Sequence, residues 1–160
     1  MNKLSKIYVA GHTGLLGAAL MKELQEEGYT NIIVRAHKEL ELKDSELVND
    51  FFATEKPEIV FMAAGRAGNL NRCITHPATL YSENSLIQNN IFAAASQYEL
   101  EHLIYFGSSC IYPNDAKQPI PEEAFLSGPL EEATKGYAAA KMSGVMACRA
   151  YNSQYYNGAC

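Results

Sequence analysis

Three glycines recur at a fixed spacing directly after the first apolar segment of the chain. Residues 6–10 form a short apolar run typical of a buried parallel strand, and Gly11, Gly14 and Gly17 follow it. The next segment, residues 15–25, has the apolar spacing of a helix. Such a turn lets the backbone approach a ligand, and the helix N-terminus attracts phosphate. The sequence therefore predicts a dinucleotide-binding turn, with a merely structural turn as the alternative.

Strands and helices alternate along the rest of the chain. Apolar runs predict further strands at residues 31–35, within 57–65 and at 102–107, and helical spacing predicts helices at 45–53, 80–98 and 137–155. Asp44 is a candidate N-cap for the first of these helices. This order predicts an α/β fold, a Rossmann-type doubly wound parallel sheet. Residues 112–135 lack periodicity and contain several prolines, which predicts a long functional loop.

Composition restricts the class of protein. A length of 160 residues suits one domain, and a net charge of −5 argues against a general nucleic-acid surface. We find no apolar run long enough to cross a membrane and no signal-peptide core at the N-terminus. The four cysteines lack metal-type spacing, so no metal site is predicted. A soluble protein of the reducing cytoplasm is the simplest expectation.

Tyr137 and Lys141 are four residues apart, which places them on one face of the predicted last helix. A lysine ammonium beside a phenol favours the phenolate, so we expect Lys141 to lower the pKa of Tyr137. Ser108 follows the strand predicted at 102–107, where it can hold a carbonyl oxygen against the phenol. The three residues suit the reduction of a carbonyl or its reverse.

These residues also carry a family resemblance. Together with the glycine pattern, they resemble the extended short-chain dehydrogenase/reductases, and the string Gly107–Pro113 is similar to that of the GDP-L-fucose synthases and their close relatives. The resemblance implies that Tyr137 is a general acid, that Lys141 also binds the nicotinamide ribose, and that Ser108 rather than Ser109 orients the carbonyl. It further implies that Cys110 is the base of an epimerisation beside a 4-keto group. A buried, purely structural cysteine is the alternative.

The segment after the second predicted strand favours NADP (NADPH) over NAD. Arg35, His37 and Lys38 are basic, and no acid occurs before Glu39, although a solvated charged turn would look similar. Fucose synthases tend to have arginines where this chain has Thr13 and His37, which leaves Arg35 as the main phosphate partner. Leu42 is placed to pack on adenine or in the core. The predicted cofactor residues are Gly11, His12, Thr13, Gly14, Leu15, Leu16, Gly17, Arg35, His37, Leu42, Ala64, Gly65, Phe106, Gly107 and Lys141.

The resemblance covers the whole chain but only about the first half of a typical family member. We therefore expect residues 1–160 to be an incomplete NADP-binding domain, truncated before the later strands and the C-terminal substrate domain. The strand at 102–107 would then be an unprotected edge, and the family's acid histidine would lie beyond Cys160.

The implied substrate is a GDP-sugar, GDP-4-keto-6-deoxy-D-mannose, converted to GDP-L-fucose. The alternatives are reduction of another GDP-4-keto sugar, such as a 6-deoxy-heptose, or a nucleotide-binding module without catalysis. Related enzymes form homodimers through the helices predicted at 80–98 and 137–155, so a homodimer is expected as well.

Overall fold

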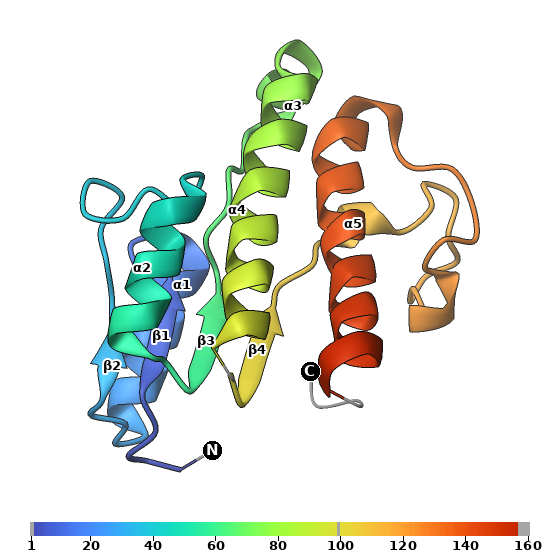
Figure 1. The fold of residues 1–160 in the computed structure, drawn as a ribbon. Helices are drawn as coiled ribbons and strands as arrows, with labels where there is room; N and C mark the ends of the chain where they lie inside the picture. Colours follow the sequence, from blue (N-terminus) through green and yellow to red (C-terminus); the bar gives the residue numbers. More distant parts are fainter. Residues whose placement is uncertain (1, 99, 157–160) are drawn as a thin grey trace.

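A parallel sheet organises the computed structural model, which describes residues 2–98 and 100–156 (Figure 1). Its strands are β1 (Ile7–Ala10), β2 (Ile32–Ile33), β3 (Ile59–Met62) and β4 (His102–Tyr105). They lie in the order β2-β1-β3-β4, and every pairing is parallel. The chain leaves β1 toward β2 on one side and returns to β3 on the other, so the carboxyl ends of β1 and β3 flank a topological switch point.

Helices cover both faces of this sheet. α2 (Ser45–Glu55), α4 (Pro77–Gln97) and α5 (Lys135–Tyr151) lie on one face, and α1 (Leu15–Glu26) lies on the other (Figure 1). This arrangement confirms the predicted doubly wound Rossmann-type fold. α5 packs along α4, which places the helix carrying Tyr137 and Lys141 beside β4.

The central strands are buried on both faces. Tyr8 and Ala10 join the larger core with α2 and α4, whereas Ile7 and Val9 join a smaller core with α1. All four side chains are at most 1% exposed. An unbroken apolar run is what a parallel strand covered on both sides requires, so the prediction for residues 6–10 is confirmed.

Several element boundaries differ from the predictions. α4 begins at Pro77, three residues before the predicted start, because proline is well tolerated in the first helical turn. A short helix, α3 (Leu70–Thr75), was not predicted; the Asn69 side chain caps it by accepting a hydrogen bond from the Arg72 N–H. α5 begins at Lys135, ends at Tyr151 and continues as a π-helical turn, Asn152–Tyr156.

Other local predictions are confirmed or refined. The Asp44 carboxylate accepts hydrogen bonds from the N–H groups of Glu46 and Leu47, so it is the N-cap of α2. The predicted loop at 112–135 contains two 3-10 turns, Glu122–Ala124 and Glu132–Thr134. Within residues 2–98 and 100–156, we find no helix with the length and apolar character needed to span a membrane. The same residues contain no cluster of acidic, histidine and cysteine side chains that could hold a metal ion.

Candidate functional site

The glycine turn joins β1 to α1 in the way that the spacing predicts. Gly11 has a φ of 82°, and the Gly14 N–H donates to its carbonyl oxygen at 3.0 Å. Gly17 is buried in the first turn of α1, where a Cβ would overlap the Gly11 carbonyl oxygen and lie 2.8 Å from His12 Cα. A Cβ on Gly11 would in turn lie 2.6 Å from Ala64 Cα. The glycines therefore bring the turn against the end of β3.

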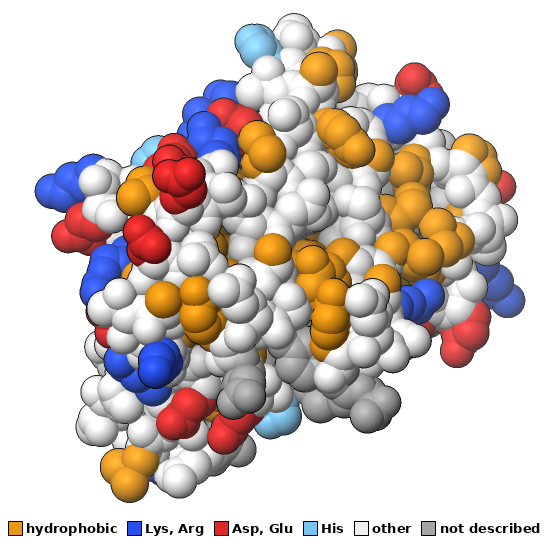
Figure 2. Space-filling model, viewed as in Figure 1, with side chains coloured by type: hydrophobic (Ala, Val, Ile, Leu, Met, Phe, Trp, Pro, Cys, Tyr) orange, Lys and Arg blue, Asp and Glu red, His pale blue; other side chains and the backbone are white. Residues whose placement is uncertain are grey.

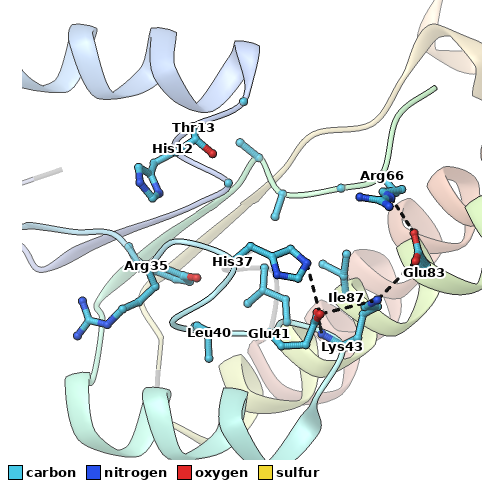
Figure 3. A pocket seen from close by; sticks show the side chains of 17 residues that line it. His12, Thr13, Arg35, His37, Leu40, Glu41, Lys43, Arg66, Glu83 and Ile87 are labelled. Carbon is cyan, nitrogen blue, oxygen red and sulfur yellow. Dashed lines mark hydrogen bonds and ion pairs between the residues drawn. The ribbon is translucent and has the colours of Figure 1, made fainter. Parts of the chain in front are cut away.

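A pocket opens beside this turn at the carboxyl ends of β1 and β3 (Figure 3). Nine of the predicted cofactor residues line it: Gly11, His12, Thr13, Gly14, Arg35, His37, Leu42, Ala64 and Gly65. Gly17 lies beneath the turn, and Leu15 and Leu16 are exposed at the start of α1. Leu40 and Ile87 add apolar surface that the sequence did not identify.

Arg35 lines this pocket, but its guanidinium is engaged elsewhere. It forms an ion pair with Glu55 near the end of α2 and donates to the Val34 carbonyl at 2.9 Å. In Figure 3 the guanidinium points away from His37 and Lys43. The expectation that Arg35 is the main phosphate partner therefore stays a prediction, and it requires Arg35 to leave Glu55.

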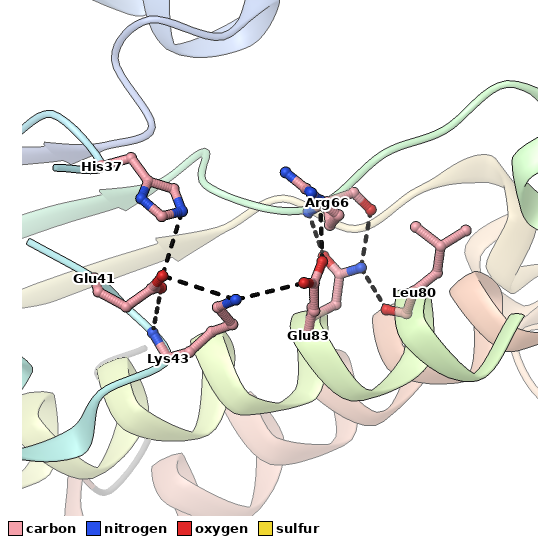
Figure 4. A network of polar contacts seen from close by, with 7 residues as sticks. His37, Glu41, Lys43, Arg66, Leu80 and Glu83 are labelled. Carbon is pink, nitrogen blue, oxygen red and sulfur yellow. Dashed lines mark hydrogen bonds and ion pairs between the residues drawn. The ribbon is translucent and has the colours of Figure 1, made fainter. Parts of the chain in front are cut away.

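Five polar side chains, four of them charged and the fifth that of His37, form a continuous chain of contacts along the pocket (Figure 4). Arg66 Nε lies 3.0 Å from Glu83, Lys43 Nζ lies 3.4 Å from Glu83 and 3.7 Å from Glu41, and His37 Nε2 lies 3.3 Å from Glu41. The chain connects the segment after β2, α4 and the segment after β3. Lys43, Arg66 and Glu83 were not predicted as site residues, because charged residues on separate elements share no common spacing in the sequence.

A buried asparagine fixes the segment after β3. Asn84, 3% exposed on α4, accepts from the Arg66 N–H and donates to the Arg66 carbonyl, both at 2.9 Å. A Cβ on Gly65 would lie 2.9 Å from Asn84 Oδ1 and 3.8 Å from Lys141 Nζ. Asn84 therefore holds the backbone that separates the pocket from Lys141. A polar residue on the buried face of a helix was the sequence signal that could have identified it.

Ser108 and Tyr137 are brought together as predicted. Burial raises the pKa of the Tyr137 phenol, and a hydrogen bond with the Ser108 side chain lowers it in part. Ser108 also accepts from the Cys110 N–H at 3.4 Å, which starts a 3-10 turn over Ser109–Ile111, whereas the Ser109 side chain is exposed. Ser108 therefore lies beside the phenol, and its role in orienting a carbonyl stays a prediction.

The expectation that Lys141 lowers the pKa of Tyr137 is corrected by this geometry. The Lys141 ammonium donates to the Phe106 carbonyl at 2.9 Å, and burial lowers the pKa of the lysine itself. Only 8% of Lys141 is exposed. Desolvation of the phenol outweighs the opposing effects, so the pKa of Tyr137 lies above its ordinary value.

A second, smaller pocket contains the predicted base. Cys110 and Tyr137 line it together with Cys73, Thr134 and three residues that follow β3: Ala67, Gly68 and Leu70. Cys73 is 8% exposed and comes from the unpredicted helix α3, so no sequence pattern placed it in this pocket. The segment after β3 thus contributes to both pockets.

Comparison with known proteins identifies the family. Residues 7–160 match the NAD dependent epimerase/dehydratase family, and the chain belongs to it. GDP-L-fucose synthase 1 of Arabidopsis thaliana is 43% identical over 154 residues, which are 96% of this chain and 48% of that protein. The chain spans about half the length of the curated relatives it matches.

Solved structures show the same relation. DdhaC superposes with a TM-score of 0.95 at 43% identity, over 98% of this chain and 45% of that one. MlghC, a GDP-mannoheptose C4 reductase from Campylobacter jejuni with NADP bound, superposes with a TM-score of 0.92 at 39% identity. This match covers 97% of the chain and 49% of the reductase.

Proposed function

We propose that this chain supplies the cofactor site and catalytic groups of an NADPH-dependent epimerase/reductase that converts GDP-4-keto-6-deoxy-D-mannose to GDP-L-fucose. The observation that supports it best is the contact between Ser108 and the half-buried Tyr137, with Lys141 one turn further along α5. Similarity to the Arabidopsis fucose synthase favours this substrate. Within residues 2–98 and 100–156, Cys73 and Cys110 are free thiols, which suits a reducing cytoplasm.

The first pocket fits a dinucleotide. The turn and the N-terminus of α1 can receive the pyrophosphate, and Leu40, Leu42 and Ile87 offer apolar surface to the adenine. The small residues Ala64 and Gly65 leave room for a ribose near Lys141. When bound, NADPH would supply the hydride that reduces the ketone carbon. NADP is bound in the similar C4 reductase, which supports this choice of cofactor.

Residues of α5 and of the segment after β4 would donate the proton to the substrate and orient the ketone. A raised pKa keeps the Tyr137 phenol protonated at neutral pH, so it can donate its proton to the ketone oxygen. The Ser108 hydroxyl would orient that oxygen by a hydrogen bond. The Lys141 ammonium would donate to the nicotinamide ribose.

Cys110 would act earlier, on the carbons beside the ketone. Protons at these carbons are acidic because the resulting carbanion delocalises onto the ketone oxygen, and a thiolate is a suitable base. Cys110 shares the second pocket with Tyr137, so one bound sugar could reach both groups. The similarity to the GDP-mannoheptose C4 reductase favours a second candidate, reduction of another GDP-4-keto sugar without epimerisation.

Replacing the proton donor tests the reductase proposal. We expect Tyr137→Phe to bind NADPH like the wild type but to reduce GDP-4-keto-6-deoxy-D-mannose about 10²- to 10⁴-fold more slowly. Tyr81→Phe, an exposed tyrosine on α4, is the matched control and should keep full activity. Unchanged reduction by Tyr137→Phe would rule out its role as the acid. NADPH binding by a wild-type protein that reduces no ketone would favour a nucleotide-binding module.

Solvent exchange distinguishes the two substrate candidates. In D₂O, an epimerising enzyme incorporates deuterium at C3 and C5 of the sugar, and we expect Cys110→Ser to abolish this exchange while reduction continues. A wild-type enzyme that reduces without any exchange would favour the simple reductase.

We also propose that the chain forms a homodimer through α4 and α5. Figure 2 shows apolar side chains along the face that these helices form, and the large exposed ones on them are Tyr81, Leu86 and Met146. Leu86→Glu should convert the dimer to a monomer in light scattering. Leu47→Glu on α2, where the leucine is equally exposed at 46%, should not. A monomeric wild type would contradict this proposal.

A further inference from the structure

A buried glutamine ties α4 to the turn of α5 that carries Lys141. Gln88 is 2% exposed, and its Nε2 donates to the Ala140 carbonyl at 3.0 Å and to Ser143 Oγ at 2.8 Å. These acceptors lie on either side of Lys141. Because a buried amide is costly to leave unpaired, this pair of hydrogen bonds fixes the rotation of α5 against α4.

Tyr105 on β4 completes the connection from the other side. Its hydroxyl donates to Gln88 Oε1 at 3.0 Å and lies 3.3 Å from the Lys141 carbonyl oxygen. The same side chain presents its ring to the Lys141 ammonium, with Nζ 4.8 Å from the ring centroid. One tyrosine therefore contacts both the backbone and the charged end of the lysine.

Gly144 on α5 provides the space that the Tyr105 side chain occupies. A Cβ on Gly144 would overlap the Tyr105 hydroxyl and lie 2.8 Å from Gln88 Oε1. Gly144 thus allows β4, α4 and α5 to approach closely enough for all the hydrogen bonds above. This cluster of hydrogen bonds combines residues of β4, α4 and α5. Only the residues from α5 are close to one another in sequence.

We propose that Tyr105 and Gln88 are positioning residues for Lys141. The Tyr105 ring favours the charged form of the buried ammonium. The hydrogen-bonded pair of the Tyr105 hydroxyl and the Gln88 amide fixes the position of the Lys141 backbone, from which the side chain extends. This inference rests on the proposed function, in which Lys141 binds the nicotinamide ribose.

The environment of Lys141 explains why an aromatic ring beside its ammonium would matter. The ammonium is buried, and burial lowers its pKa. Titratable groups that act on one another around this site include Tyr137 and Cys148 on α5, Tyr105 on β4 and Cys110 after β4. Glu83 on α4 is paired with Lys43 and Arg66. An aromatic ring has no net charge, but its face has a negative electrostatic potential that stabilises a cation. The Tyr105 ring can therefore stabilise the ammonium without a second buried charge that would itself require desolvation.

The test measures the pKa of Lys141 by NMR in protein carrying ¹³C-labelled lysine, with Lys141→Arg to assign its resonance. Tyr105→Leu removes the ring, and we expect the pKa of Lys141 to fall by about one. Tyr105→Phe keeps the ring and should leave that pKa unchanged. Phe92→Leu is the control for disturbance of the core, because Phe92 packs on Tyr105 with centroids 5.7 Å apart.

Cofactor affinity tests the second half of the inference. Tyr105→Phe and Gln88→Leu should each weaken NADPH binding about threefold to tenfold, because a loosened turn misplaces the ammonium. With Tyr105→Leu, weakening of NADPH binding at alkaline pH should begin at a lower pH than in the wild type. If Tyr105→Leu does not fold, Tyr105→Met makes the same comparison.

An unchanged pKa in Tyr105→Leu, or an equal fall in Tyr105→Phe, would overturn the role of the ring. Wild-type NADPH affinity in both Tyr105→Phe and Gln88→Leu would overturn the role of the hydrogen bonds. A separate measurement, NADPH binding by Lys141→Met, would show that the proposed function itself is wrong. If Lys141→Met binds NADPH normally, Lys141 has no role at the cofactor, whatever the measured pKa values.

Discussion

Gly17 is the residue at which a single missing side chain matters most. It is buried beneath the turn, and any Cβ there would meet the backbone of Gly11 and His12. We expect Gly17→Ala to destabilise the protein by about 2 to 4 kcal/mol, because backbone atoms cannot move aside as a side chain can. Urea unfolding would measure the loss.

Gly28 provides the matched control. It has a φ of 82° and no atom within 4 Å of an added Cβ, so the strain there is conformational alone. Gly28→Ala should cost only about 1 kcal/mol. Equal losses at the two positions would show that crowding at Gly17 is unimportant.

At the scale of elements, the cap of α2 is the clearest local cause of a boundary. The Asp44 carboxylate accepts two backbone N–H groups that would otherwise lack partners in the first turn. Asp44→Ala should destabilise the protein by about 1 kcal/mol, and Asp44→Asn should cost much less because it keeps the acceptor. Urea unfolding of the three proteins at pH 7 gives the comparison. A loss in Asp44→Asn as large as in Asp44→Ala would mean that the charge, not the acceptor, matters.

At the scale of the whole molecule, Glu55 connects three parts of the chain. At the end of α2 it forms ion pairs with Lys6, which precedes β1, and with Arg35, which follows β2. A hydrogen bond from Lys6 lowers the pKa of this carboxyl, and the charges of Lys6 and Arg35 lower it further. Since the pKa is lower in the folded protein, the stabilisation is complete above the unfolded value, near 4.3, and disappears as the pH falls through the folded value.

Glu55→Gln should therefore reduce the acid sensitivity of the fold. At pH 7 we expect the variant to be less stable by no more than about 1 kcal/mol, and the difference should shrink as the pH falls below the unfolded value and through the folded pKa of Glu55. Glu26→Gln is the control, because Glu26 is 60% exposed in a simple ion pair with Lys22. The measurement is the urea midpoint at several pH values. A difference that persists unchanged at pH 3 would contradict the assignment.

The sequence by itself determined the features that depend on neighbouring residues. The glycine turn, the Asp44 cap and the parallel strands all follow from short-range spacing, because backbone geometry repeats every few residues. The same spacing put Tyr137 and Lys141 on one helix.

Only the tertiary structure decided what surrounds these groups. It turned Arg35 toward Glu55, brought Cys73 into the pocket of Cys110, and joined Gln88 and Tyr105 around Lys141. It also reversed the expected direction of the Tyr137 pKa. The physical reason is that burial and charge pairing act across space between elements far apart in sequence, so no local pattern records them.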